Sequence, residues 1–146
     1  MNHLFTLLVL FLGSVLISNA QPVIEWQYSL GGSLSDQIDH YNRVSNTMKQ
    51  TPDGGFIIAG TSYSNDGDVT GHNGPSSTSD YWVVKLDSMG GIDWQRSLGG
   101  MADDFARGVD ATSDGGYIVI GDSYSDDGDV SNHFGSIDTS DAWVVK

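Results

Sequence analysis

The chain has 146 residues, no cysteine and a formal net charge of −13. This acidity argues against a nucleic-acid partner and against binding to anionic membrane surfaces, because both interactions depend on Lys and Arg. Glu25 is the only glutamate among 19 acidic residues, and 19 glycines accompany them. Since aspartate and glycine favour turns, the composition predicts β-structure with many turns.

The first 20 residues, MNHLFTLLVLFLGSVLISNA, resemble a secretory signal peptide. Residues 4–17 form an apolar run of the length of an h-region, and Ser18 and Ala20 are small residues at the −3 and −1 positions of a cleavage site. A membrane anchor is the alternative, but the run is short for a bilayer span. The sequence predicts cleavage after Ala20 and a secreted, extracellular or cell-surface protein, without membrane insertion after cleavage.

The rest of the chain holds two copies of one sequence unit. EWQYSLGG at 25–32 returns as DWQRSLGG at 93–100, and TSDYWVVK at 78–85 returns as TSDAWVVK at 139–146. Between them, PDGGFIIAGTSYSNDGDV at 52–69 returns as SDGGYIVIGDSYSDDGDV at 113–130. Segment 33–52 is seven residues longer than its counterpart 101–113. We therefore divide the mature chain into one unit at 21–87 and a second at 88–146.

Each unit is predicted to form four short strands. They are residues 23–30, 42–50, 56–61 and 81–86 in the first unit, and 92–98, 108–112, 117–122 and 142–146 in the second. The DGG sequence before each third strand predicts a tight turn, because glycine accepts positive φ. No segment has sustained helical periodicity, and 36–41 forms one helical turn at most. Four antiparallel strands that lead directly into the next copy are typical of a propeller blade, so we expect an all-β, propeller-like chain with two four-stranded blades of an incomplete propeller.

Two pairs of tryptophans occupy matching positions, Trp26 with Trp94 and Trp82 with Trp143. Aromatic residues at strand centres usually pack in the core, so these side chains are expected to fill the space between blades. The alternative role is stacking on sugar rings.

The repeated motifs W-Q-x-S-L-G-G, D-G-G-[FY]-I, S-Y-S-x-D-G-D-V and W-V-V-K resemble a tandem repeat of secreted proteins from Bacteroidetes and flavobacteria. The resemblance covers residues 24–146. It implies a β-propeller, often large and surface-exposed and often exported by type IX secretion, and says little about activity. Propellers typically need four or more blades. The resemblance therefore suggests the N-terminal portion of a longer protein with further blades, and the alternative is a two-unit chain that closes a ring by self-association.

The loops 64–80 and 125–141 are long for a compact domain, which indicates that something orders them or that they are functional. Their clustered oxygen side chains would suit Ca²⁺. The candidate ligands are Asn65, Asp66, Asp68, Asp126, Asp127 and Asp129. Neither loop fits the EF-hand template, and the alternative is a turn in which Asp and Asn bond their own backbone. Calcium is the one possible cofactor that the sequence offers.

No catalytic motif is present in the sequence. His72 and His133 match between the loops, but no catalytic or metal partner accompanies them. The neighbouring Asp103 and Asp104 are more typical of capping or solvated residues than of a glycosidase pair. The sequence favours a secreted, non-catalytic module that binds a glycan or protein, for example in adhesion. The alternative is part of a carbohydrate-active propeller enzyme, a hydrolase or lyase.

Overall fold

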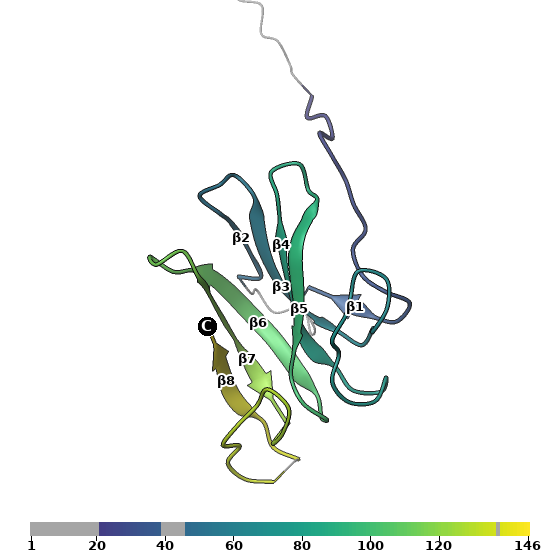
Figure 1. Ribbon diagram of the computed structural model, residues 1–146, viewed down its shortest axis with the longest axis vertical. Helices are drawn as coiled ribbons and strands as arrows, with labels where there is room; N and C mark the ends of the chain where they lie inside the picture. The colour runs from purple at the N-terminus through teal and green to yellow at the C-terminus, as the bar shows by residue number, and fades with distance from the viewer. Residues whose placement is uncertain (1–20, 39–45, 137) are drawn as a thin grey trace, which may run out of the picture.

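The computed structural model describes residues 21–38, 46–136 and 138–146. The signal peptide predicted for residues 1–20 lies outside these ranges. The described chain forms antiparallel strands and no helix (Figure 1), which confirms the prediction of an all-β chain. In the same residues we find no helix with the length and apolar character that crossing a membrane requires.

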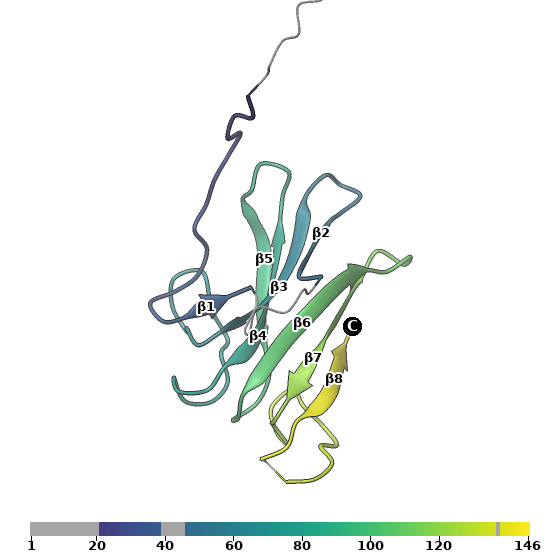
Figure 2. The same ribbon diagram turned by 180° about the vertical axis from the view of Figure 1, so that it is seen from behind.

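The strands form two sheets, which we call sheet A and sheet B. Sheet A contains β1 (Asp36–Gln37), β2 (Met48–Gln50), β3 (Phe56–Ser62), β4 (Asp80–Leu86) and β5 (Ile92–Leu98). Sheet B contains β6 (Asp104–Ala111), β7 (Tyr117–Ser123) and β8 (Asp141–Val145). In sheet A, β1 and β2 both pair with one edge of β3, β4 pairs with the other edge of β3, and β5 pairs with β4. The strand order in sheet B is β6-β7-β8. Figures 1 and 2 show the two sheets packed side by side, with β6 next to sheet A.

β1 and β2 are two parts of one interrupted edge strand. Ten residues, 38–47, separate Gln37 of β1 from Met48 of β2, whereas three residues, 106–108, separate the equivalent Phe105 and Val109 in continuous β6. The seven extra residues of the first repeat therefore interrupt an edge strand. An edge strand tolerates such an insertion because only one neighbour loses hydrogen bonds.

Two sequence predictions around this insertion need correction. The single helical turn that the sequence allowed at 36–41 is not found at Asp36 and Gln37, which pair with β3 as a strand. The strand expected at 42–50 is found at Met48–Gln50. Residues 39–45, on which the rest of both predictions falls, lie outside the described residues.

The strand predicted at 23–30 is also wrong. Residues 21–30 contain no strand, although their sequence matches that of β5. The physical reason is the absence of a neighbouring strand. β5 pairs along β4, from Tyr81 opposite Leu98 to Leu86 opposite Ile92, whereas no equivalent of β4 among the described residues lies beside residues 23–30. A strand without a hydrogen-bonding partner is not stable in water.

The prediction of four strands in each of two blades is met in sheet A alone, and there in a different grouping. β5 was predicted at its observed limits but completes sheet A instead of opening sheet B. Sheet A therefore has four strand positions and sheet B has three. β3, β4, β7 and β8 differ from the predicted strands by at most one residue at either end, whereas β6 begins at Asp104 instead of residue 108.

The core between the sheets is apolar. It joins one face of β3 and β4 to the inner face of sheet B, and its buried members are Ile57, Ala59, Tyr81, Val83, Ala106, Val109 and Val119. Trp143 packs at its margin, with its ring centroid 4.8 Å from that of Tyr81 in the other sheet. Trp94 of sheet A lies 5.9 Å from Tyr117 of sheet B. Trp143 thus lies between the sheets, as predicted, whereas Trp94 contacts sheet B but is 39% exposed.

A second apolar cluster covers the opposite face of sheet A. Its buried residues are Val69, Trp82, Val84 and Leu86, with Leu30, Phe56 and Ile58 packed against them. β3 therefore has apolar side chains on both faces: Ile57 and Ala59 are buried between the sheets, and Phe56 and Ile58 are partly buried on the outward face. Trp82 is 7% exposed and its indole N–H donates to Gln95 Oε1 at 3.0 Å, so it is a core residue.

Candidate functional site: the loops at the repeat junctions

The loop that follows β3, residues 64–80 (loop 1), is fastened to the chain segment that enters sheet A. Asp68 Oδ2 accepts a hydrogen bond from the Gly31 N–H at 3.1 Å, and Asp66 Oδ1 accepts one from the Ser33 N–H at 2.7 Å. This contact with Ser33 lowers the pKa of the Asp66 carboxyl below its usual value. The two aspartates of the DGD motif thus bind one backbone N–H within the SLGG motif and one directly after it.

The loop that follows β7, residues 125–141 (loop 2), makes the same contacts one repeat later. Asp129 Oδ2 accepts from the Gly99 N–H at 3.3 Å, and Asp127 Oδ1 accepts from the Met101 N–H at 2.7 Å. The DGD and SLGG motifs therefore make the same structural contact in both repeats. We call these contacts the junction hydrogen bonds.

The glycines of SLGG make room for these carboxylates. A Cβ on Gly100 would lie 2.4 Å from Asp127 Oδ1 and 2.6 Å from the Asp127 carbonyl oxygen. A Cβ on Gly32 would meet Asp66 at the same two distances. In the loops, Gly67 and Gly128 have φ of 62° and 64°, a conformation that favours glycine. Both glycine pairs are thus required by the junction geometry.

A further aspartate stands at the start of each edge strand. Asp36 Oδ2 accepts from the Gly32 N–H at 2.7 Å, and its equivalent Asp104 accepts from the Gly100 N–H at 2.8 Å. Asp104 also accepts from the Ser125 hydroxyl at 2.9 Å. The Asp104 side chain is fully buried, and this burial raises its pKa.

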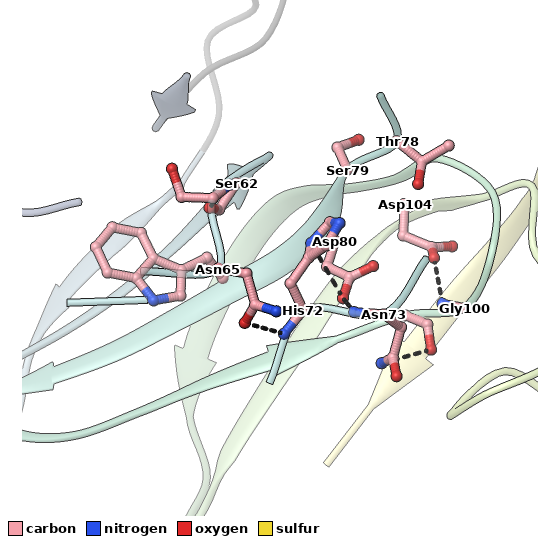
Figure 3. Close-up of polar contacts among 12 residues, drawn as sticks. Ser62, Asn65, His72, Asn73, Thr78, Ser79, Asp80, Gly100 and Asp104 are labelled. Carbon is pink, nitrogen blue, oxygen red and sulfur yellow. Dashed lines mark hydrogen bonds and ion pairs between the residues drawn. The ribbon is translucent and has the colours of Figure 1, made fainter. Parts of the chain in front are cut away.

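At the junction between the sheets a second buried carboxyl, Asp80 of β4, lies close to Asp104 (Figure 3). A Cβ on Gly99 would lie 2.4 Å from Asp80 Oδ1 and 2.5 Å from Asp104 Oδ2, so both carboxyls border the space that Gly99 leaves. Burial, assisted by the charges of Asp104 and Asp129, raises the pKa of Asp80 to about 7. Asp80 Oδ2 accepts from the Asn73 N–H at 2.7 Å, which fixes loop 1 to β4.

The side chains of the two histidines are enclosed within their loops. The His72 side chain is 3% exposed, and its Nδ1 lies 3.6 Å from Asp80 Oδ2. His133 repeats this arrangement with Asp141 at 3.6 Å. Each Nε2 faces a loop carbonyl, that of Pro75 at 3.4 Å in the first case. Because both rings are enclosed, the geometry gives them a structural role within their loops.

The six candidate calcium ligands belong to two sets of three, one in each loop. In each loop the two DGD carboxylates accept backbone hydrogen bonds, while Asn65 Oδ1 faces the His72 N–H at 3.4 Å and Asp126 is exposed. Within the described ranges, no group of three Asp, Glu, His or Cys side chains is arranged to hold a metal ion. Calcium binding remains a prediction from the sequence. Four of the six side chains bond backbone amides that lie 26–37 residues earlier in the chain, and not the backbone of their own turn as the alternative expects.

Sequence reasoning identified the DGD motifs but gave no role to Asp36, Asp80 or the SLGG glycines. The signal was present, because TSD precedes both W-V-V-K strands and SLGG precedes both edge strands. What the sequence alone could not show is that these three motifs meet at one junction. No protein-family model matches the chain, and no curated protein matches it significantly.

Proposed function

We propose that this chain is a secreted or cell-surface, non-catalytic module of propeller-like repeats that binds a glycan or protein ligand through loops 1 and 2. The observation that carries the proposal is the way these loops are held. Loop 1 follows β3 and loop 2 follows the equivalent strand β7. Both loops expose the Asp-Gly residues of their DGD motif, and both are fastened to the sheets by the junction hydrogen bonds. Binding residues are commonly placed on loops that a rigid scaffold positions.

The topology supports a shared binding edge. Short turns join β2 to β3, β4 to β5 and β6 to β7, while loops 1 and 2 lie at the other end of these hairpins (Figure 1). Equivalent exposed residues, such as Asn65 and Asp126, therefore recur along one end of the molecule. In a propeller with further blades, in the same chain or by self-association, this end would present a row of similar loops.

The chemistry of the junction supports a binding role over a catalytic one. Asp80 and Asp104, the carboxyl groups with raised pKa, are fully buried and hydrogen-bonded to backbone amides. A glycosidase needs its carboxyl pair on either side of an accessible glycosidic bond. These buried groups cannot contact a sugar, so their arrangement favours a structural role at the junction.

The test is retention of tagged residues 21–146 on insoluble polysaccharides (cellulose, chitin and starch granules) and on immobilised gelatin and mucin. We expect retention on at least one of these surfaces. The variant with Asn65→Ala and Asp126→Ala should lose it, because both exposed loop tips are changed. The control variant, Pro52→Ala with Ser113→Ala, changes equivalent exposed positions in the opposite turns and should bind normally.

Two outcomes would contradict the proposal. Equal retention of the loop and turn variants would remove the loops from the binding surface. Release of soluble sugar fragments from a polysaccharide by the purified chain would instead support the enzyme alternative, a hydrolase or lyase.

A further inference from the structure

The outer edge of β8 is open. In sheet A the equivalent strand, β4, lies between β3 and β5, but β8 pairs with β7 alone in the described part of the chain. Open strand edges are templates for pairing with another chain. The edge belongs to a WVVK strand, whose counterpart in sheet A accepts the WQRSL strand β5.

Residues 23–30 are a second copy of β5 that lacks a WVVK partner. They are already positioned as β5 is positioned relative to the next sheet. The ring centroids of Trp26 and Phe56 of β3 lie 5.9 Å apart, and those of the equivalent Trp94 and Tyr117 of β7 also lie 5.9 Å apart. The junction hydrogen bonds fasten the end of both segments in the same way. Only the neighbouring strand is missing.

The two open sheet faces repeat the two sides of the existing interface between the sheets. Sheet A packs on sheet B through Ile57, Ala59, Tyr81 and Val83. The equivalent positions in sheet B are Ile118, Ile120, Ala142 and Val144, which point away from sheet A. Ile120 is 50% exposed and Val144 is 57% exposed. This outward face of sheet B is therefore an apolar surface of the kind that sheet A buries.

The outward face of sheet A provides the matching surface. It contains a recess of about 430 Å³, whose lining includes Trp26, Phe56, Ile58, Trp82 and Val84. The last four occupy the positions that Tyr117, Val119, Trp143 and Val145 occupy on the inner face of sheet B. The outward face of sheet B thus resembles the inner face of sheet A, and the outward face of sheet A resembles the inner face of sheet B.

We propose that copies of this chain associate head to tail. Residues 23–30 of one copy add as a strand to β8 of the next, and the outward face of sheet B in that copy packs into the recess on sheet A of the first. The β4–β5 register transfers directly to this pairing: Val83 opposite Arg96 becomes Val144 opposite Tyr28, and Trp82 opposite Ser97 becomes Trp143 opposite Ser29.

An ion pair supports the same register. Lys85 Nζ lies 2.9 Å from Asp53 and 3.3 Å from Asp93, which immediately precedes the WQRSL sequence. Lys146 lies at the equivalent position and contacts Asp114, the counterpart of Asp53. The counterpart of Asp93 is Glu25, so head-to-tail pairing brings the single glutamate of the chain to Lys146 of its neighbour.

One position in the proposed interface is poorly filled. Tyr81, which packs on Trp143 and donates its hydroxyl to the Trp143 carbonyl at 3.3 Å, is replaced by Ala142 in the second repeat. A neighbouring copy would therefore present an alanine to Trp82. Restoring the tyrosine should strengthen association, because a buried aromatic ring contributes a large contact area.

The interface is heterologous, since each copy uses two different surfaces. Such contacts close into rings when the rotation allows it and otherwise extend as filaments. Propellers typically contain about four to eight blades, so rings of about two to four copies would reproduce known propeller sizes.

Sedimentation velocity of residues 21–146 over a range of concentrations is the first test. We expect reversible oligomers larger than the monomer. Val144→Lys should shift the distribution to monomer by placing a charge in the apolar face. Met101→Lys introduces the same charge at a residue that is 59% exposed in a loop, and it should leave association unchanged. Ala142→Tyr should shift the distribution toward oligomers at lower concentration, a gain that misfolding would not produce if the circular dichroism spectrum is retained.

Cysteine cross-linking tests the register, because the chain has no cysteine of its own. A tagged Tyr28→Cys chain mixed with an untagged Val144→Cys chain should form a disulfide-linked heterodimer, since directly opposed residues of antiparallel strands have Cα atoms about 4.5–5.5 Å apart. Gln27→Cys in place of Tyr28→Cys points to the other face and should cross-link far less. A monomer at every concentration for both the natural sequence and Ala142→Tyr, or equal cross-linking of the two cysteine pairs, would overturn the proposal.

Discussion

Asp127 accepts a hydrogen bond of 2.7 Å from the backbone N–H of Met101, which lies 26 residues earlier in the chain. Asp66 holds Ser33 by an equal bond, 33 residues earlier. These long-range bonds link each loop to the segment that enters its sheet. They explain why the DGD and SLGG motifs occur together in both repeats.

Removing one of these carboxylates should destabilise the fold modestly. We expect Asp127→Ala to lower the free energy of unfolding by about 1 kcal/mol, the usual net contribution of one hydrogen bond. Asp66→Ala should also lower the free energy of unfolding, and the two losses should add because the sites are separate. Urea denaturation measures these changes. Asp126→Ala alters the exposed neighbour outside the junction bonds, and an equal loss in that variant would show that the junction bonds are not the cause.

Substitutions at Gly100 and Asp127 should have coupled effects on the free energy of unfolding. Gly100→Ala forces its Cβ against the Asp127 carboxylate and carbonyl oxygen, and we expect a loss of about 1–3 kcal/mol, typical of overpacking. Because this displaces Asp127, adding Asp127→Ala should cost less than it does in the natural sequence. A double-mutant cycle from urea denaturation gives the coupling.

The control for this cycle is Gly115→Ala. Gly115 has φ of 85° and open space around its Cβ position, so alanine there is strained but contacts nothing. Its cost should simply add to that of Asp127→Ala. Additivity in the Gly100 cycle as well would contradict the junction geometry.

The sequence was informative about strands that have a neighbour and misleading where the neighbour is missing. β3, β4 and β5 were predicted closely, because apolar runs and DGG turns are local signals. Residues 23–30 carry the same pattern as β5 and form no strand, since pairing is a property of two segments. Asp80 and Asp104 were missed as a buried pair for a similar reason: 24 positions apart, they approach each other only when sheets A and B pack together.

Calcium should have no effect on stability if the junction bonds fully occupy the DGD carboxylates. Asp66, Asp68, Asp127 and Asp129 each accept a backbone hydrogen bond in the structure. We therefore expect the same melting temperature for residues 21–146 in excess Ca²⁺ and in chelator. A rise of several degrees in Ca²⁺, lost in the combined Asp66→Ala and Asp127→Ala variant, would establish the loops as ion sites.

The buried Asp80 should make the protein less stable as pH rises from about 4 to about 7. Burial raises its pKa to about 7 in the folded chain, from an ordinary value of 3.8. Between these values the unfolded chain loses the proton and the folded chain keeps it, so unfolding becomes more favourable by up to about 1.4 kcal/mol per pH unit. The carboxyls of Asp53, Asp66 and Asp114 have lowered pKa values, and the stability they contribute is lost only at more acid pH.

Asp80→Asn should remove the part of this dependence that Asp80 contributes, while its side-chain oxygen still accepts the Asn73 N–H; the buried Asp104, whose pKa is also raised, keeps its own part. We expect the variant to be more stable than the natural sequence at pH 8, by a margin that shrinks toward pH 4. Chemical denaturation at intervals of one pH unit measures the difference. Asp126→Asn makes the same change in net charge at an exposed site and should run parallel to the natural sequence. Parallel curves for Asp80→Asn as well would mean that Asp80 is ionised in the folded protein at neutral pH and that its charge is compensated at the junction.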